Sequence, residues 1–236
     1  MTVYWDSLVE DQDLGVQRDF VSVGSTFVRC NLGGIRGSAD TGGGKNQTRY
    51  LECSFDGLVL DWRGVGVARF ERCSFRGVRI KKLQAPAAEF VDCTFSGSLR
   101  SSVFSRTVDQ VIYKELERKV NDFSGNDFTD CDFYDVEFRN GIDLTQQRLP
   151  VGRGYVLLPD SQSQLAQCRA ALDVVFDEPE RERARLLLEI WLDASPREPQ
   201  MLVQPDTSRN PSVARKLAEL AASFGNRAPG SASPTT

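Results

Sequence analysis

The strongest constraint on the fold is a spacing of twenty residues between similar segments. The chain reads YLECSFDG from residue 50, FERCSFRG from residue 70 and FVDCTFSG from residue 90. An aromatic residue, a cysteine three positions later and a phenylalanine or leucine two positions after that occur together five times, starting at Phe27, Tyr50, Phe70, Phe90 and Phe128. A repeat of nearly fixed length is typical of chains that fold as stacked, similar turns.

Within each repeat, large apolar residues recur at every fifth position, as at Tyr50, Phe55, Leu60 and Val65. A period of five fits neither the 3.6-residue period of a helix nor the two-residue period of an ordinary strand. Four steps of five make one period of twenty, so a coil with four short sides returns each residue to a place above its counterpart one turn earlier. The spacing therefore predicts a four-sided solenoid.

The segments CSFDG, CSFRG, CTFSG, CDFYD, NDFSG and NDFTD resemble the five-residue repeat of the pentapeptide-repeat family. The resemblance covers about residues 20–145, and the register is lost between residues 98 and 120. It implies a mainly β fold, a right-handed quadrilateral β-helix, in which the central Leu or Phe and the small residue two positions earlier point inward. We expect these inward positions to form the core, made of Phe27, Cys30, Tyr50, Cys53, Phe55, Phe70, Cys73, Phe75, Phe90, Cys93, Phe95, Phe128, Cys131 and Phe133.

The cysteines of this column are predicted to be small core residues. Stacked coils place equivalent residues about 4.8 Å apart, which is longer than the usual Cβ separation in a disulfide. A straight column also cannot surround one ion tetrahedrally. A packing role is therefore favoured over metal binding or redox chemistry for these cysteines. Cys168, outside the repeats, receives the same interpretation, and we expect no metal and no cofactor.

Charged residues change sign along the solenoid. The outward column Arg49, Arg69, Glu89 and Asp127 is expected to pair charges between coils. A basic patch is predicted at Arg63, Arg69, Arg76, Arg79, Lys81 and Lys82, and an acidic face is predicted at Asp122, Asp127, Asp130, Asp132, Asp135 and Glu137. Two interpretations stay open, a solvated surface that stabilises the stack and a docking surface for a charged partner.

Two segments interrupt the repeat. Residues 36–49 are rich in glycine and are predicted to leave the coil as a mobile loop. Residues 106–121 carry Val108, Val111, Ile112 and Leu116 at helical spacing, so a helical insertion on the solenoid wall is expected. Both segments are candidate interaction sites, although an inserted helix could also merely cover a sheet edge.

The rhythm of five ends near residue 145, and helix signals replace it. One apolar stripe contains Leu165, Cys168 and Leu172, a second helix is expected from about Pro179, and a third is expected from Pro211 to Gly225. We expect residues 1–19 to be a lead-in or cap, 20–145 the solenoid, 158–225 a helical cap or dimerisation region, and 226–236 a disordered tail.

Composition excludes several functions. The chain has no histidine, which removes the usual general base and the catalytic systems built on histidine. Its net charge of −4 is mild, and neither a basic leader nor a long apolar run is present, so a soluble, cytoplasmic protein is expected.

These observations favour a non-enzymatic scaffold that presents charged faces, a loop and a helix to a protein partner. Some pentapeptide-repeat proteins mimic DNA and protect DNA gyrase, and the acidic segment would be the matching part here, with possible homodimerisation through the C-terminal helices. Direct nucleic-acid binding through the basic patch is not favoured, because the phenylalanine columns point inward and cannot stack on bases.

Overall fold

A computed structural model describes residues 1–152 and 154–225 of the chain. The chain divides into two compact units, Met1–Val151 and Gly152–Thr236. The predicted disordered tail, residues 226–236, lies outside the described residues.

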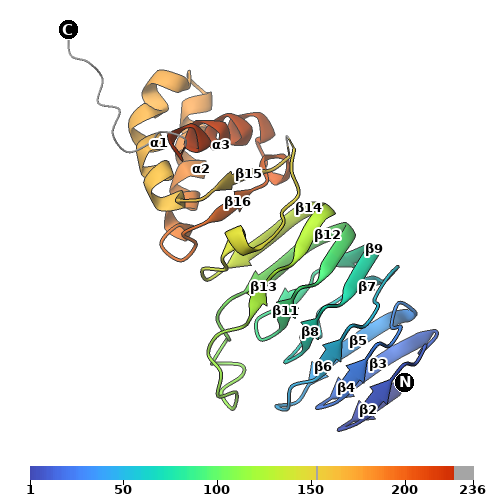
Figure 1. The fold of residues 1–236 in the computed structure, drawn as a ribbon. Helices are drawn as coiled ribbons and strands as arrows, with labels where there is room; N and C mark the ends of the chain where they lie inside the picture. Colours follow the sequence, from blue (N-terminus) through green and yellow to red (C-terminus); the bar gives the residue numbers. More distant parts are fainter. Residues whose placement is uncertain (153, 226–236) are drawn as a thin grey trace. The chain divides into compact units, whose positions relative to one another are not determined.

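The first unit is a parallel β-solenoid, as the sequence predicts. Strands about twenty residues apart lie side by side, so that Tyr50 pairs with Phe70 and Phe70 with Phe90. Successive coils form rungs from the blue N-terminal end to β14 in Figure 1. Its three sheets are ordered β1-β3-β5, β13-β11-β8-β6-β4-β2 and β10-β12-β9-β7 with β14 on β12. The right-handed sense of the coil stays a prediction from the resemblance.

The strands of this unit are mostly short, and several longer ones run round a corner of the coil. Their bounds are β1 Thr2–Trp5, β2 Leu8–Glu10, β3 Gln17–Val23, β4 Thr26–Val28, β5 Ile35–Gly43, β6 Arg49–Leu51, β7 Val59–Asp61, β8 Arg69–Glu71, β9 Ser74–Lys81, β10 Gln84–Ala85, β11 Glu89–Val91, β12 Thr94–Ser105, β13 Phe123–Ser124 and β14 Asp127–Arg139. A 3-10 turn, η1, follows at Leu144–Gln146.

Stacked aromatic rings fill the interior. All the predicted core residues are buried, and none of them has more than 7% of its surface exposed. The rings of Phe55, Phe75, Phe95 and Phe128 form one stack with centroids 4.8, 4.7 and 4.5 Å apart. Each ring thus takes part both in its own coil and in the contact between coils, which ties the five-residue period to stability.

The register continues further than the sequence suggests. β12 pairs with β14 from Thr94 to Ser105, with β9 from Thr94 to Arg100 and with β10 at Val103 and Phe104. The ring of Phe104 stacks on that of Phe138 at 5.4 Å. The prediction that the register is lost is therefore wrong for residues 98–105. A register shift between Phe95 and Gly97 puts Leu99, rather than residue 100, opposite Ile80, which hides the period in the sequence.

The predicted boundaries of the first coils are also wrong. β1 pairs with β3 and β2 with β4, so residues 1–19 belong to the solenoid instead of forming a separate lead-in. Residues 36–43 lie in β5, which pairs with β3, and not in a loop. Gly42 is needed for close packing: a Cβ there would lie 2.5 Å from the backbone nitrogen of Ala68 and from the carbonyl oxygen of Val65. Glycine in this segment allows two coils to approach, and the exposed turn shrinks to residues 44–46.

The second unit consists of helices and a small hairpin. Helix α1 spans Ser161–Val175, α2 Glu180–Ala194 and α3 Pro211–Gly225, which confirms the three predicted helices. An antiparallel pair, β15 (Val156–Leu158) and β16 (Met201–Val203), and a 3-10 turn, η2 (Pro205–Thr207), complete the unit. Leu165, Cys168 and Leu172 of α1 pack in one core with Val213 and Leu217 of α3.

Candidate interaction site: the inserted loop and its carboxylate anchor

The insertion is a loop, and the prediction of a helix at residues 106–121 is wrong. We call residues Thr107–Val120 the inserted loop. Thr107 and Val120 form an antiparallel bridge at its base, and the amide of Val108 donates to the carbonyl oxygen of Lys119 at 3.0 Å. Near the tip, Asp109 accepts hydrogen bonds from two successive amides, those of residues 111 and 112, and this turn replaces the first turn of a helix.

The apolar stripe of the insertion divides between the wall and the solvent. Val108 is buried against Val67 and Ala87 of the solenoid, and Tyr113 and Leu116 pack on the same cluster. These contacts fix the loop on the wall with part of its apolar surface. The rest of that surface remains available at the tip.

Two β-branched side chains occupy this tip. Val111 is 90% exposed and Ile112 is 67% exposed. Ile112 lines two grooves, one of about 380 Å³ beside the Gly44–Lys45 turn and one of about 460 Å³ beside Pro86 and Arg139. An apolar tip between two grooves can bury surface against a partner from either side.

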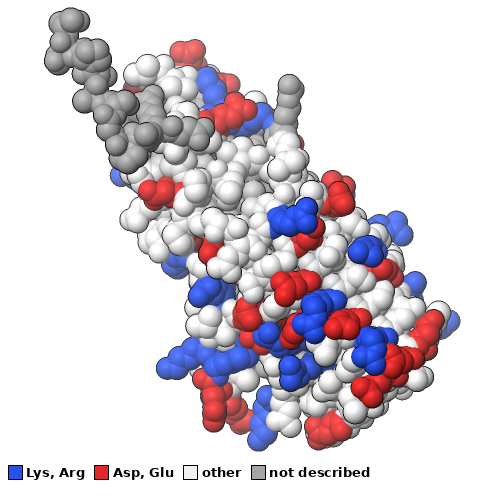
Figure 2. All heavy atoms as spheres, viewed as in Figure 1, with Lys and Arg blue, Asp and Glu red and all other residues white. Residues whose placement is uncertain are grey.

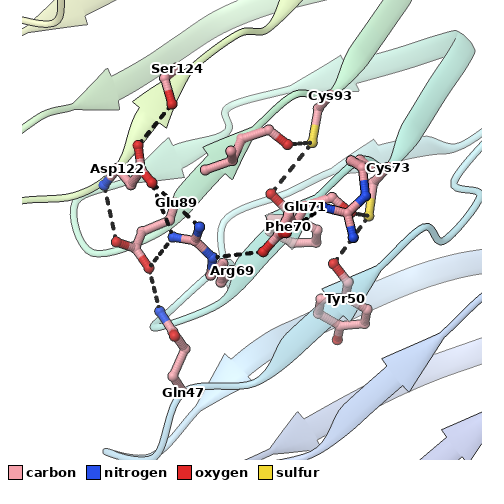
Figure 3. Close-up of polar contacts among 12 residues, drawn as sticks. Gln47, Tyr50, Arg69, Phe70, Glu71, Cys73, Glu89, Cys93, Asp122 and Ser124 are labelled. Atoms are coloured by element: carbon pink, nitrogen blue, oxygen red, sulfur yellow. Dashed lines mark hydrogen bonds and ion pairs between the residues drawn. The ribbon is translucent and has the colours of Figure 1, made fainter.

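A buried carboxylate anchors the base of the loop. Glu89, at the start of β11, is 7% exposed. It accepts a hydrogen bond from Nε2 of Gln47 at 2.7 Å and one from the backbone amide of Asp122 at 3.0 Å. Its oxygens also lie 3.4 Å from Arg69 and 3.5 Å from Arg118. Figure 3 shows Glu89 between Gln47, Arg69 and Asp122. One side chain thus links two adjacent coils, the turn near residue 47 and the inserted loop.

Arg118 and Asn121 hold the C-terminal end of the loop. Burial lowers the pKa of the Arg118 guanidinium, and the charge of Glu89 opposes that shift. Arg118 also donates to the carbonyl oxygen of Ala87 and to the side chain of Asn121. Asn121 is buried and donates to the carbonyl oxygens of Pro86 and Ser105 at 3.2 and 2.8 Å. The base of the loop is therefore fixed by polar contacts on both sides.

The structure distributes the predicted acidic face around a whole coil. Phe123, Phe128, Phe133 and Phe138 mark the four sides of that coil, and an acidic residue directly precedes each of them: Asp122, Asp127, Asp132 and Glu137. Asp130 and Asp135 lie between these positions. Residues that follow one another in the sequence wind round all four sides, so the six carboxylates form a ring instead of one face.

The predicted basic patch is also divided. Arg69 lies on β8, within 3.4 Å of Asp122, so members of the two predicted patches neutralise each other. Lys82 pairs with Asp61 at 2.8 Å. Arg63, Arg76, Arg79 and Lys81 are exposed, and among the described residues no ion pair is found for them. Figure 2 shows blue and red side chains interspersed over the visible face of the solenoid.

One corner of the solenoid carries alternating charges. Asp11, Arg29, Glu52, Arg72 and Asp92 each have positive φ, between 51° and 56°, and follow the strands of the six-stranded sheet. Arg29 forms two hydrogen bonds to Asp11, at 2.7 and 2.8 Å, and Arg72 lies 3.2 Å from Glu52. Opposite charges thus alternate from coil to coil, which supports the interpretation that this column stabilises the stack, although exposed pairs of this kind contribute little.

The thiols are core groups. All six cysteines are free and buried. Burial raises the pKa of Cys131 to about 12 and that of Cys168 to about 11, so both thiols stay protonated at neutral pH. Among the described residues no cluster of cysteine, aspartate and glutamate could hold a metal ion. Within the same residues, no helix has the length and apolar character needed to cross a membrane.

Sequence reasoning placed Glu89 in the correct column but missed its role. The predicted column Arg49, Arg69, Glu89, Asp127 ends instead on Asp122, because the chain resumes the coil there after the insertion. The available signal was the segment AAEF, in which an acidic residue follows two alanines and precedes a core phenylalanine. A carboxylate in such apolar surroundings needs partners.

Comparison with protein-family models finds no match, and neither does comparison with curated protein sequences. Among solved structures, the chain is similar to QnrB1, described as a plasmid-mediated fluoroquinolone resistance protein. The match has 11% sequence identity, covers 63% of this chain and 82% of that chain, and has a TM-score of 0.18. A TM-score this low does not establish a shared fold, and the solenoid fold follows from the chain's own repeat and coils. With an inward column of phenylalanine and cysteine every twenty residues and parallel four-sided coils, the chain has the architecture of a pentapeptide-repeat protein.

Proposed function

We propose that the chain is a non-enzymatic scaffold that binds a protein partner through the inserted loop. One observation carries the proposal: the tip of the loop exposes Val111 and Ile112, while its base is anchored by a buried carboxylate. A surface loop has no packing reason to present two β-branched apolar side chains to water. A partner would bury them.

The anchoring also favours binding energetically. Ordering a flexible loop on association costs free energy, and a loop that is already fixed avoids much of that cost. Val108, Tyr113 and Leu116 hold the stem on the solenoid wall, and Asn121 and Arg118 hold its end. The tip therefore reaches the partner in a defined position, as rigid scaffolds with functional loops do.

Affinity capture with the full chain as bait tests this proposal. In quantitative mass spectrometry, the amount of partner recovered with the Val111→Ser, Ile112→Ser double variant should fall at least tenfold. The control Val174→Ser alters a side chain on α1 that is 88% exposed, and it should recover the partner normally. Circular dichroism should show both variants folded, because none of the three residues is buried. Equal recovery of all partners by the tip variant and the unmodified chain would exclude the loop as the docking site.

A DNA-mimic role that modulates DNA gyrase is the second proposal. Asp130, Asp132 and Asp135 are exposed, and in the described part of the chain they form no ion pair. Three carboxylates without an ion pair on one coil support this role. The cations interspersed on the solenoid count against it, so the scaffold proposal is favoured. In a gyrase supercoiling assay, the chain should change the activity, and the triple variant with asparagine at these positions should not. Indifference of gyrase to the unmodified chain at tens of micromolar would exclude this role.

A further inference from the structure

A second exposed apolar surface lies in the C-terminal unit. A groove of about 420 Å³ runs between α2 and the segment that leads into α3. One wall consists of Arg183, Leu186, Leu187 and Ile190 of α2, and the other includes Arg209 and Val213. All of these residues belong to one unit, so the groove is a feature of that unit alone.

The α2 wall follows the helical period. Its four residues have the spacing i, i+3, i+4 and i+7, so they share one face over roughly 10 Å, at about 1.5 Å per residue. Leu187 and Val213 pack on the core and form the floor. Leu186 and Ile190 are 62% and 65% exposed and form the rim. The groove can thus accept apolar side chains spaced three or four residues apart on a short helix.

The charges of the groove are all of one sign. Arg183 and Arg209 are exposed, and within the described residues neither has an ion-pair partner. Among the described residues that line the groove, none is an aspartate or glutamate. The neighbouring arginines of α2 behave differently, since Arg181 and Arg185 both lie within 3.6 Å of Asp173. Two free guanidinium groups beside an apolar groove are complementary to carboxylates next to apolar side chains.

We infer that this groove binds a short acidic, amphipathic segment of a protein partner. Such a segment would place leucine-like side chains on Leu186 and Ile190 and would pair aspartate or glutamate with Arg183 and Arg209. A second copy of the chain fits the groove less well. In a two-fold interface the same surface faces itself, so four arginines would meet with no carboxylate from either lining.

Selection from a displayed library of random helical peptides, with the immobilised full chain as target, tests the inference. Peptides that are enriched should carry Asp or Glu beside Leu, Ile or Phe at spacings of three or four. In fluorescence anisotropy, an enriched peptide should bind the Leu186→Ser, Ile190→Ser variant at least about tenfold more weakly. Each of Arg183→Glu and Arg209→Glu should cost about fivefold or more, and added salt should weaken binding to the unmodified chain.

Two control variants distinguish binding in the groove from general effects of mutation. Arg185 lies on α2 outside the groove, so Arg185→Glu should bind the selected peptide with an affinity within about twofold of that of the unmodified chain. The loop variant Val111→Ser, Ile112→Ser should bind the peptide normally, so this inference and the loop proposal can fail separately. Enrichment of basic or neutral peptides, or no enrichment over the Leu186→Ser, Ile190→Ser variant, would overturn the inference. A dimer in sedimentation that this variant abolishes would assign the groove to a second copy instead.

Discussion

Replacing Glu89 with glutamine should release the inserted loop from the solenoid wall. The substitution preserves the size of the side chain but removes the charge that faces Arg69 at 3.4 Å and Arg118 at 3.5 Å. It also replaces one acceptor oxygen by an NH2 group. If that group faces the Nε2 donor of Gln47, which now lies 2.7 Å from the carboxylate, a hydrogen bond is lost as well.

The free energy required to open the loop should fall by about 2 kcal/mol. Unit charges 4 Å apart attract by about 4 kcal/mol at an effective dielectric constant of about 20. The cost of burying the charged groups offsets much of this attraction. Arg69 keeps Glu71 and Asp122 as partners in the variant, whereas in the described residues Arg118 has Glu89 as its ion-pair partner. A net change comparable to one hydrogen bond to a charged group remains.

Hydrogen exchange measures this opening directly. The amides of Val108 and Asn121 donate to the carbonyl oxygens of Lys119 and Arg106, so their exchange reports on the base of the loop. A loss of about 2 kcal/mol should speed their exchange about thirtyfold. Glu52→Gln is the matched control, because that carboxylate pairs with an arginine but is exposed.

The control should leave the loop amides unchanged and should cost less than about 1 kcal/mol in overall stability. Unchanged exchange in the Glu89→Gln variant would refute the reasoning, and so would an equal acceleration in the two variants. Either result would mean that the apolar contacts of the stem hold the loop without the carboxylate.

Three further predictions concern the solenoid. Phe75→Ala removes the middle of an aromatic stack and should cost about 3–5 kcal/mol in urea unfolding, whereas Val59→Ala at a half-exposed position should cost less than about 1 kcal/mol. Gly42→Ala should destabilise the fold by more than Gly57→Ala, since the first Cβ would meet backbone atoms at 2.5 Å, whereas the second would meet nothing within 4 Å. Gly57 has a φ of 72°, so its alanine variant should carry only the left-handed backbone strain of about 1 kcal/mol, and equal thermal midpoints would contradict the prediction. Cys131 has a pKa raised by burial to about 12, so the folded state holds its proton more tightly than the unfolded state. Its contribution to stability is complete below the ordinary thiol pKa near 9 and should be lost as the pH rises toward 12, and Cys131→Ala should remove that part of the pH dependence of the urea midpoint.

The core could be predicted from the sequence because the geometry repeats. A ring at every fifth position has one place to go in a four-sided coil, and Phe55, Phe75 and Phe95 stack as their spacing requires. The helices of the second unit could also be predicted, because the stripe and the end signals of α3, Pro211 and Gly225, agree with each other.

The prediction of a loop at residues 36–49 was wrong because it relied on the glycine content of the segment. Gly42 and its neighbours have the composition of a flexible loop, but a missing Cβ also permits two backbones to approach closely. Composition cannot distinguish these two uses of glycine, because the second depends on a coil that lies more than twenty residues further along the chain.

The insertion and the charged patches were predicted, but the conformation of the first and the placement of the second were not, for a related reason. Val108, Val111 and Ile112 have helical spacing, yet Asp109 forms a turn and the wall takes up part of the apolar stripe. Neighbouring charges in the sequence look like one patch, but a coil of twenty residues sends them to different sides. Pairs such as Arg69 and Asp122 become neighbours only through the stacking.

The solenoid requires the rings of Phe55, Phe75 and Phe95 to stack in successive coils. Selective isotope labelling of phenylalanine rings, with nuclear Overhauser effects recorded between them, measures this stacking directly. The structure predicts strong ring-to-ring effects from Phe75 to both Phe55 and Phe95, whose centroids lie 4.8 and 4.7 Å away. If Phe75 instead shows effects only to residues three or four positions away along the chain, the coil is absent and the account is contradicted.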